Sequence, residues 1–487
     1  MKKEILKCFW LLITSISIFM VSCEKDAERT DSRHPVSGET LKVNNFIRDD
    51  VKDYYLWTST IDWKLIEPKY EPDSYTFFDK LIYKTEDHWS MLTDDAQGFT
   101  DRLDGISTSF GYELIWGKYI NSTARYAIVL YVYPGSPAEK AGLQRGDFLI
   151  YIDGNKDITD ANYMDLYNAP SISLGKAVLT DNGKLMPDPH PVNMVAVTMY
   201  EDPVVKDTIV VKGTHRIGYL CYTNFTRESE KRLLEVFAKF KLQGVTDIVL
   251  DLRYNGGGYT ETSRLLSSML APDAVVRRKD IYLTKTWNDE LTAYFKKEGD
   301  DTSDYFMDNL PVNMELSRLY VLTLRFSASA SEATMIGLNP YMDVIQIGEA
   351  THGKYYGGLL LNPMVYDRGK NTWVTDKEIE NWLMYLMVYR YADRTGNTSF
   401  SGGLIPDYQV EENYNYILPP LGDDRDPLFG KAIELITGES VKTRSAQTLP
   451  HPHPIDGVHL RSPLNGKMIG QFNGYRSGKI FPKEEKE

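Results

Sequence analysis

The spacing of hydrophobic residues changes several times along the chain, and each change predicts a different kind of element. Residues 43–57 and 228–242 place apolar side chains three or four positions apart, which predicts amphipathic helices. Residues 109–115 and 126–133 alternate apolar and polar side chains, which predicts strands. We therefore expect a helical segment near the start of the chain and a β-rich segment after it.

The second half of the chain follows a strand–helix–strand order. Residues 217–222 and 248–252 are apolar runs on either side of the helix 228–242, which predicts an α/β core. Residues 253–258 (Arg-Tyr-Asn-Gly-Gly-Gly) then predict a turn that can approach a ligand closely, before a helix over 260–270. Such a turn could hold a phosphate or only connect two elements. The full phosphate-loop pattern is absent, because no Gly-Lys-Ser/Thr follows.

A second junction lies at residues 321–332, where an apolar strand ends in small residues and turns into a helix. Backbone N–H groups at a helix start stabilise negative charge, so a nucleophile here could carry out acyl transfer. The candidate nucleophiles are Ser327, Ser329 and Ser331. The candidate bases are His352 and Lys354. A lysine has a reference pKa of ~10.4, which must fall by ~3 units, at a cost of about 4 kcal/mol, before it acts near neutrality.

The first 23 residues have the features of a targeting signal. Lysines 2, 3 and 7 precede an apolar run from Phe9 to Val21, shorter than the ~20 residues of a comfortable membrane span. The run ends in Val-Ser-Cys, and Cys23 resembles the lipidated cysteine of bacterial lipoproteins. That resemblance implies a signal peptide over 1–22, a lipid anchor on Cys23 and a location in the cell envelope. An ordinary secretory signal is the alternative.

Composition limits the partners. The 487 residues contain 55 Lys+Arg and 68 Asp+Glu, a net charge of −13 without a basic stripe, so we expect no nucleic-acid partner. A hydrophobic content of 42% is sufficient for several cores. After removal of the signal only Cys23 and Cys221 remain, so we expect no internal disulfide. We expect no cofactor and no metal site. His451 and His453 alternate with prolines and lack a third ligand nearby, which favours a polar tail.

Residues 134–154 read Pro-Gly-Ser-Pro-Ala-Glu-Lys-Ala-Gly-Leu-Gln-Arg-Gly-Asp-Phe-Leu-Ile-Tyr-Ile-Asp-Gly. This run resembles the PDZ domains attached to bacterial proteases. The resemblance implies that Phe110, Gly111 and Tyr112 form the loop that receives a peptide's terminal carboxylate, with strand addition beside it. The alternative is a PDZ-like domain that only spaces or regulates an active site.

Three motifs in order resemble the C-terminal processing (tail-specific) serine peptidases of family S41. They are Asp-Leu-Arg-x-Asn-x-Gly-Gly from 251, Ser-Ala-Ser-Ala-Ser-Glu from 327, and Gly-x-x-x-x-Gly-Lys from 348. The resemblance implies a Ser/Lys dyad of Ser329 as nucleophile and Lys354 as general base, with the N–H groups of Gly257 and Ala330 as oxyanion donors. It implies a mixed α/β (α+β) fold, with a crotonase-like ββα peptidase core, an inserted or preceding PDZ domain and a small N-terminal helical domain.

One position departs from the family pattern. Many members carry a glutamine four residues after the lysine, and this chain has Gly358. Lys354 must then be oriented by another group, for which His352, Thr351 and Tyr355 are candidates. Two other readings therefore stay open: a catalytically degenerate, peptide-binding envelope lipoprotein, and a structural lipoprotein whose PDZ domain docks a partner.

These observations predict six regions. They are a signal peptide (1–22), a tether (23–40), a helical domain (41–100), a PDZ domain (104–205), a peptidase core (211–438) and a polar tail (439–487). The tryptophans at 57, 63 and 89, and the block 87–92, are expected to pack in the core. The predicted function is hydrolysis of peptide bonds in peptides or in unfolded or C-terminal protein segments.

Overall fold

The computed structural model describes residues 34–118, 122–154, 156–180, 185–398, 400–412, 414, 418–440, 453–454 and 467–469. The predicted signal peptide, Cys23 and the first part of the predicted tether lie outside the described residues. Most of the predicted tail lies outside them as well, and its described parts are 439–440, 453–454 and 467–469.

The described helices cover the N-terminal segment and both faces of the central sheet. They are α1 (Gly38–Tyr54), α2 (Ser74–Leu81), α3 (Ala96–Leu103), α4 (Pro137–Lys140), α5 (Asp165–Asn168), α6 (Glu230–Leu242), α7 (Thr260–Leu270), α8 (Asp273–Arg277), α9 (Asp289–Glu298), α10 (Ala330–Leu338) and α11 (Pro427–Thr437). Short 3-10 helices lie at Thr58–Thr60, Trp63–Leu65, Pro68–Tyr70 and Arg227–Ser229.

A mostly parallel sheet forms the centre of the molecule. Its order is β11 (Val204–Lys212), β12 (His215–Tyr222), β13 (Asp247–Asp251), β17 (Arg318–Thr323), β18 (Asp343–Gly348) and β23 (Tyr408–Gln409), with only β11 antiparallel to its neighbour. Successive side chains of these strands point to opposite faces, and both faces are buried. Leu250 packs in the core that also holds α6, while Val249 packs in the core that holds α11. The near-continuous apolar runs in the sequence follow from this double coverage.

A second sheet stands beside the first. Its order is β14 (Gly257–Tyr259), β25 (Lys467–Ile469), β19 (Tyr356–Leu361), β22 (Leu383–Ala392), β15 (Ile281–Trp287) and β16 (Asp304–Tyr305), and β1 (Met91–Thr93) also pairs with β22. The apolar run 382–391 belongs to this sheet. The run forms one long strand, because partners on both edges and a buried face accommodate a continuous hydrophobic sequence.

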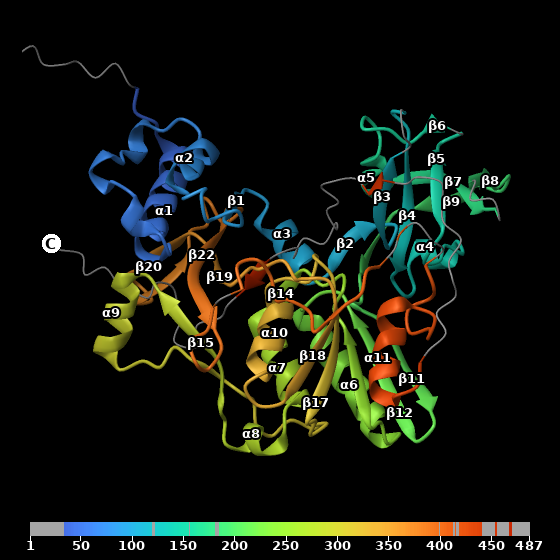
Figure 1. The fold of residues 1–487 in the computed structure, drawn as a ribbon. Coiled ribbons are helices and arrows are strands. Elements are labelled where there is room, and N and C mark those ends of the chain that lie inside the picture. The colour runs from blue at the N-terminus through green and yellow to red at the C-terminus, as the bar shows by residue number, and fades with distance from the viewer. Residues whose placement is uncertain are drawn as a thin grey trace, which may run out of the picture.

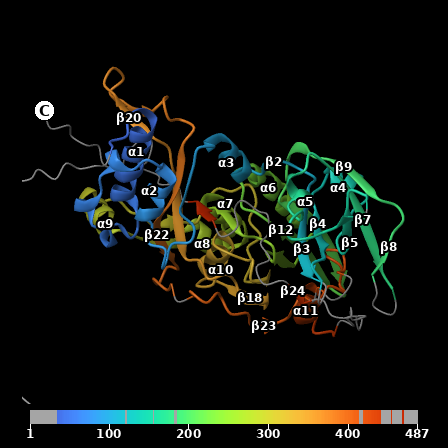
Figure 2. The ribbon, with the colours of Figure 1, turned by 90° about the horizontal axis from the view of Figure 1, so that it is seen from above.

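The N-terminal helices pack on this second sheet. Residues of α1, including Val43, Ile47 and Val51, belong to the same hydrophobic core as the strand β22. Seen from above, α1 and α2 lie at one end of the molecule and the PDZ strands at the other, with α7 and α10 between them (Figure 2). The segment predicted as a helical domain therefore shares its core with the peptidase region.

The PDZ region is built on a third sheet. Its order is β24 (His453–Pro454), β3 (Tyr112–Lys118), β4 (Arg125–Val132), β5 (Phe148–Ile152), β7 (Ser171–Leu179) and β8 (Leu185–Pro187), with β6 (Lys156–Asp157) beside β5 and β9 (Val192–Val195) beside β7. Two further pairs are β2 (Ile106–Ser109) with β10 (Val197–Tyr200), and β20 (Met364–Asp367) with β21 (Thr372–Thr375). The PDZ region occupies the upper right of Figure 1, whereas β20 lies at the left, near α1.

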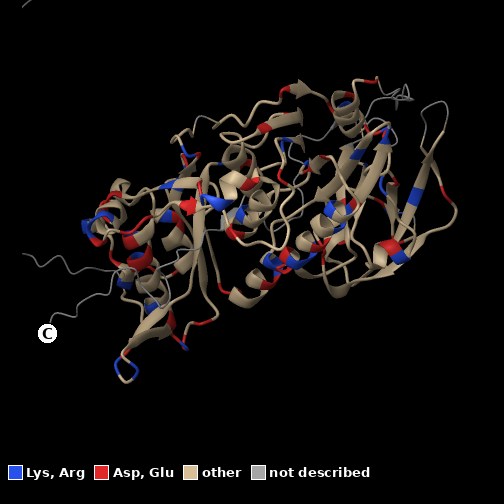
Figure 3. Cartoon of the chain, turned by 90° about the horizontal axis from the view of Figure 1, so that it is seen from below, with Lys and Arg blue, Asp and Glu red and all other residues tan. Residues whose placement is uncertain are grey.

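Charged residues of both signs are interspersed along the chain (Figure 3). Among the described residues, none of the helices is long and apolar enough to cross a membrane. Within the same residues, no group of three or more His, Cys, Asp or Glu side chains could hold a metal ion. Cys221 is a buried free thiol.

Candidate active site

Ser329 sits in the short connection between strand β17 and helix α10, immediately before the helix. Its backbone has φ 61° and ψ −107°, a region that residues other than glycine rarely adopt. The residue is fully buried, and its Oγ has no hydrogen-bond partner within the described part of the chain. A strained backbone and an unpartnered hydroxyl both cost free energy, so the surrounding structure must hold this conformation.

The carboxylate of Glu332 provides much of that restraint. Its Oε2 accepts the Ser329 N–H at 2.7 Å and the Lys354 N–H at 3.0 Å. Its Oε1 accepts the Thr351 hydroxyl at 2.6 Å and the Gly353 N–H at 2.6 Å. Because two bonds meet at Oε2, the backbone nitrogens of Ser329 and Lys354 are no further apart than the sum of the bonds, about 5.7 Å. One buried acid thus joins the serine segment to the lysine segment.

Burial acts against the charge of this acid. Removal from water raises the pKa of Glu332 to about 7, although the hydroxyl of Thr351 and the backbone N–H groups favour the ionised form. In the sequence, Glu332 is only the last residue of the motif that begins at Ser327.

Lys354 is fully buried and lies between aromatic rings. Its Nζ is 4.9 Å from the centre of the Trp89 ring and 5.7 Å from that of Tyr385, and it donates to the Tyr385 hydroxyl at 3.5 Å. The Tyr391 hydroxyl lies 2.5 Å from the Lys354 carbonyl oxygen and 3.0 Å from that of Ser329. Strand β22 therefore supplies two tyrosines to the region that holds Ser329 and Lys354.

The other candidates from the sequence occupy different surroundings. Ser327 donates to the Leu252 carbonyl at 2.8 Å, and Ser331 donates to the Asn255 carbonyl at 2.9 Å, so both hydroxyls have structural partners. The His352 side chain is exposed, with its ring 6.3 Å from that of Trp89. Partial desolvation and the neighbouring Lys354 lower the pKa of His352.

The glycine turn after β13 contacts the serine segment through Asn255. This fully buried residue accepts the Ala328 N–H at its carbonyl, and its side-chain Oδ1 accepts the Gly257 N–H at 2.9 Å. The Ala330 N–H, by contrast, donates to no acceptor that the structure describes. Gly258 has φ +139°, and a Cβ there would meet the Phe225 carbonyl oxygen at 2.3 Å, so this turn requires glycine.

Strand β25, from the end of the chain, lies beside this turn. Lys467 to Ile469 run parallel to β14, in register with Gly257 to Tyr259, and Ile469 also pairs with Gly358 of β19 (Figure 1). The space between β14 and β19 thus holds one extended strand. β14 begins at the predicted oxyanion donor Gly257, and β19 begins two residues after Lys354.

Comparison with known proteins agrees with this geometry. Residues 216–410 match the family model "Peptidase family S41", residues 42–91 match the "Peptidase S41 N-terminal domain", and residues 128–165 match a PDZ domain. The chain belongs to peptidase family S41. It is a serine-type peptidase, as the resemblance in the sequence indicated, and its mixed α/β fold with a PDZ domain confirms the predicted fold class.

Three relatives illustrate the distance within the family. The chloroplastic C-terminal processing peptidase of Tetradesmus obliquus is 26% identical over 345 residues, which are 67% of this chain and 66% of that protein. The carboxy-terminal processing protease CtpA of Bacillus subtilis is 25% identical over 399 residues, 79% of this chain and 74% of that one. The crystal structure of a candidate S41 protease from Bacteroides fragilis has a TM-score of 0.66 at 25% identity, covering 81% of this chain and 97% of that one.

The predicted peptide-binding loop of this S41 peptidase lies at the start of β3. Phe110 and Tyr112 are buried, and Gly111 has φ +80°, with its carbonyl accepting the Tyr133 N–H at 2.9 Å. Strand β24 pairs antiparallel with the far end of β3, His453 opposite Lys118. The outer edge of β3 is therefore able to take an added strand. Carboxylate binding by this loop stays a prediction.

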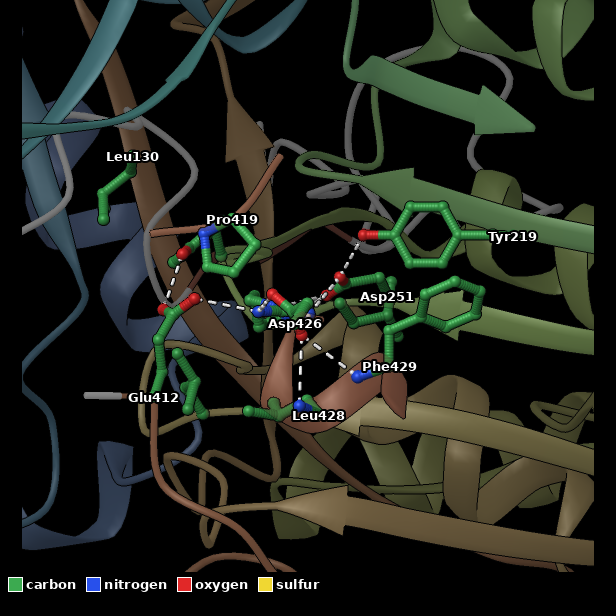
Figure 4. Close-up of polar contacts among 12 residues, drawn as sticks. Leu130, Tyr219, Asp251, Glu412, Pro419, Asp426, Leu428 and Phe429 are labelled. Atoms are coloured by element: carbon green, nitrogen blue, oxygen red, sulfur yellow. Dashed lines mark hydrogen bonds and ion pairs between the residues drawn. The ribbon is translucent and has the colours of Figure 1, made fainter. Parts of the chain in front are cut away.

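A buried ionic network connects the PDZ domain of the peptidase to its active-site region (Figure 4). Arg253, which follows β13, is fully buried and contacts the carboxylates of Asp251, Asp426 and Glu412. Arg145 of the PDZ region contacts Glu412 and donates to the Tyr254 hydroxyl at 2.7 Å. Although burial opposes the charge, Arg145 and Arg253 lower the pKa of Glu412 to about 2. Buried charges are tolerated here because each is paired.

Several residues of the site were not identified as functional from the sequence. Trp89 was read as packing, yet its ring faces the amine of Lys354. Asn255 appeared only as part of a glycine turn, and Tyr385 and Tyr391 belong to none of the recognised motifs. Each of them lies at least 31 residues from both Ser329 and Lys354 in sequence, so local patterns carried no signal. The roles of Ser329, Lys354, Gly257 and Ala330 stay predictions.

Proposed function

We propose that this chain is an endopeptidase that cleaves peptides, or unfolded and C-terminal protein segments, with Ser329 as nucleophile and Lys354 as general base. The observation that carries the proposal is the shared Glu332 carboxylate, which places the Ser329 and Lys354 backbones side by side while the Ser329 Oγ is left without a partner among the described residues. A fully buried lysine suits the role, because burial generally disfavours the charged amine and a base must be neutral.

The chemistry would proceed in two halves. The neutral amine of Lys354 takes the Ser329 hydroxyl proton while Oγ attacks the peptide carbonyl carbon, giving a tetrahedral oxyanion. The proton then passes to the leaving amine as the C–N bond breaks and an ester forms on Ser329. Water attacks the ester with Lys354 again as base, and the second product leaves as a carboxylic acid, so the enzyme returns to its starting state.

The oxyanion requires two N–H donors. The Ala330 N–H is suitably placed at the start of α10, where the helix dipole favours negative charge. The Gly257 N–H is donated to Asn255 Oδ1, so in the proposed mechanism the oxyanion takes over this bond when substrate binds.

The substrate is proposed to bind as an extended strand. The slot between β14 and β19 already accommodates residues 467–469 in that form, and main-chain pairing there does not depend on side-chain identity. The PDZ domain is proposed to capture the same chain first, because the edge of β3 accepts a strand at β24.

This binding mode makes a prediction about the tail. A substrate must displace residues 467–469, and because β25 lies between two strands, every N–H in it faces one neighbour or the other. Met468→Pro removes one of these donors and is expected to raise kcat/KM several-fold for a short peptide substrate. Met468→Leu keeps the N–H and is expected to behave as the parent. Equal kcat/KM for all three proteins would contradict displacement.

The proposed function is tested by incubating the protein with reduced casein and identifying new peptide termini by mass spectrometry. Cleavage together with labelling of Ser329 by a fluorophosphonate supports the proposal. Absence of both, in a protein that still binds peptides, would instead favour the catalytically degenerate peptide-binding lipoprotein.

We also propose attachment to the membrane of the cell envelope through a lipid on Cys23, on the strength of the residues around it. Partitioning of the expressed protein into a detergent phase tests this, and recovery in the aqueous phase alone would contradict it.

A further inference from the structure

Position 358, where this chain has glycine and many family members have glutamine, lies beside Tyr385 of the neighbouring strand β22. A Cβ built on Gly358 would meet the Tyr385 ring at 2.5 Å and the end of the Met387 side chain at 2.5 Å. The room into which a glutamine from β19 would extend is therefore taken by Tyr385 of β22. A larger residue at position 358 would collide with Tyr385 in its present position.

Tyr385 reaches the proposed base. It is fully buried, its ring centre is 5.7 Å from the Nζ of Lys354, and its hydroxyl oxygen accepts from that Nζ at 3.5 Å. The Trp89 ring lies against the same Nζ, at 4.9 Å. Hydrogen bonds at catalytic groups are often long without substrate and shorten in the reacting complex.

We propose that Tyr385 is the positioning residue for Lys354 in this peptidase, taking over from across the sheet the task that a glutamine four residues after the lysine performs in relatives. Its ring limits where the amine can lie, and its hydroxyl binds one N–H so that the lone pair is directed toward Ser329. The inference rests on the proposed role of Lys354 as general base.

A second tyrosine–lysine contact, between Tyr389 and Lys285, provides a matched control. Tyr389 also lies on β22, is fully buried, and has its ring 5.2 Å from the Nζ of Lys285. A Cβ on Gly357 would meet its ring at 2.1 Å. Lys285 is bound to the Asp304 carboxylate at 2.7 Å. Like Tyr385, Tyr389 is a buried tyrosine of β22 whose ring lies beside a lysine, but that lysine is Lys285.

The first test compares Tyr385→Phe with Tyr389→Phe in the full-length protein. Tyr385→Phe is expected to lower kcat on a peptide substrate about 10- to 100-fold with KM nearly unchanged, because a misdirected base affects the chemical step. Tyr389→Phe is expected to stay within about twofold of the parent. Parental kcat in Tyr385→Phe, or equal losses in both variants, would overturn the proposal.

The pH profile separates positioning from simple packing. Loss of the hydroxyl removes an acceptor for the ammonium form, so the acid limb of the kcat profile is expected to move to lower pH in Tyr385→Phe. Tyr391 and Glu332 bind the Lys354 backbone and His352 lies two residues before it, and these three titratable groups are unchanged in this variant. An acid limb at the parental pH would count against the proposal.

A measurement without turnover distinguishes this inference from the proposed function. In the Ser329→Ala protein, the ¹³Cε signal of Lys354 can be assigned by its loss in Lys354→Met and followed with pH. A Tyr385→Phe shift of that titration supports positioning even if the protein proves not to cleave peptides. An unshifted titration overturns the inference even if Ser329 is the nucleophile.

Restoring the family's arrangement completes the test. Gly358→Gln alone is expected to lose activity, because the side chain collides with Tyr385. Gly358→Gln with Tyr385→Ala makes room for the glutamine and is expected to recover at least about tenfold over Tyr385→Ala alone. No recovery in the double variant would contradict an equivalent task for the two residues.

Discussion

Replacing Ser329 by alanine is expected to lower peptide turnover by at least about a thousandfold while leaving the protein as stable as the parent, or slightly more so. Turnover falls because the attacking oxygen is removed. Stability is retained because the Oγ is buried with no hydrogen bond among the described residues, so its loss leaves no partner unsatisfied. Casein cleavage rates and thermal unfolding of the same preparations check both parts.

Two further variants test the assignment of the dyad. Lys354→Met keeps an unbranched side chain that is one atom shorter, removes the amine and is expected to lose turnover to a similar extent. Ser331→Ala, two residues away at the same helix start, breaks a 2.9 Å bond to the Asn255 carbonyl and is expected to lose about 1 kcal/mol of stability while keeping most of its activity. Normal cleavage by Ser329→Ala, or inactivity of Ser331→Ala alone, would remove the assigned dyad.

Replacing Glu332 by glutamine is expected to reduce both turnover and stability. Each oxygen of the Glu332 carboxylate accepts hydrogen bonds from two donors. The glutamine amide has only one oxygen, so its NH₂ group would face the two donors that the other oxygen had bound. An unsatisfied buried donor costs about 1–3 kcal/mol, which predicts a loss of a few kcal/mol in the free energy of unfolding. Turnover is expected to fall about 100-fold, because the serine and lysine segments lose their common anchor.

The pH dependence of that loss provides a control. The pKa of Glu332 is raised by burial from 4.5 in the unfolded chain to about 7, so its contribution to stability is fully present below pH 4.5 and is lost as pH rises through about 7. Glutamine does not titrate, and other groups cancel in the comparison. The stability gap between the parent and Glu332→Gln, measured by urea unfolding, should therefore narrow from pH 5 to pH 8. A gap that is constant or widens would contradict a raised pKa.

Much of the local structure could be predicted from the sequence. The helices predicted over 228–242 and 260–270 are present as α6 and α7, because the periodicity of apolar residues acts over a few residues. The PDZ and S41 motifs were also recognisable, since each consists of consecutive residues around a strand end. The candidate residues Ser329 and Lys354 came from those motifs.

The sequence by itself therefore determined the family, the order of the elements and the residue types available for chemistry. Only the tertiary structure decided how the site is held together. Glu332 joins two segments 22 residues apart, and Trp89 and Tyr385 approach Lys354 from the N-terminal region and from a neighbouring strand. Residues 467–469 lie beside the glycine turn from the far end of the chain. Such contacts depend on how whole elements pack, and packing reflects the combined burial of many side chains instead of the spacing within any one segment.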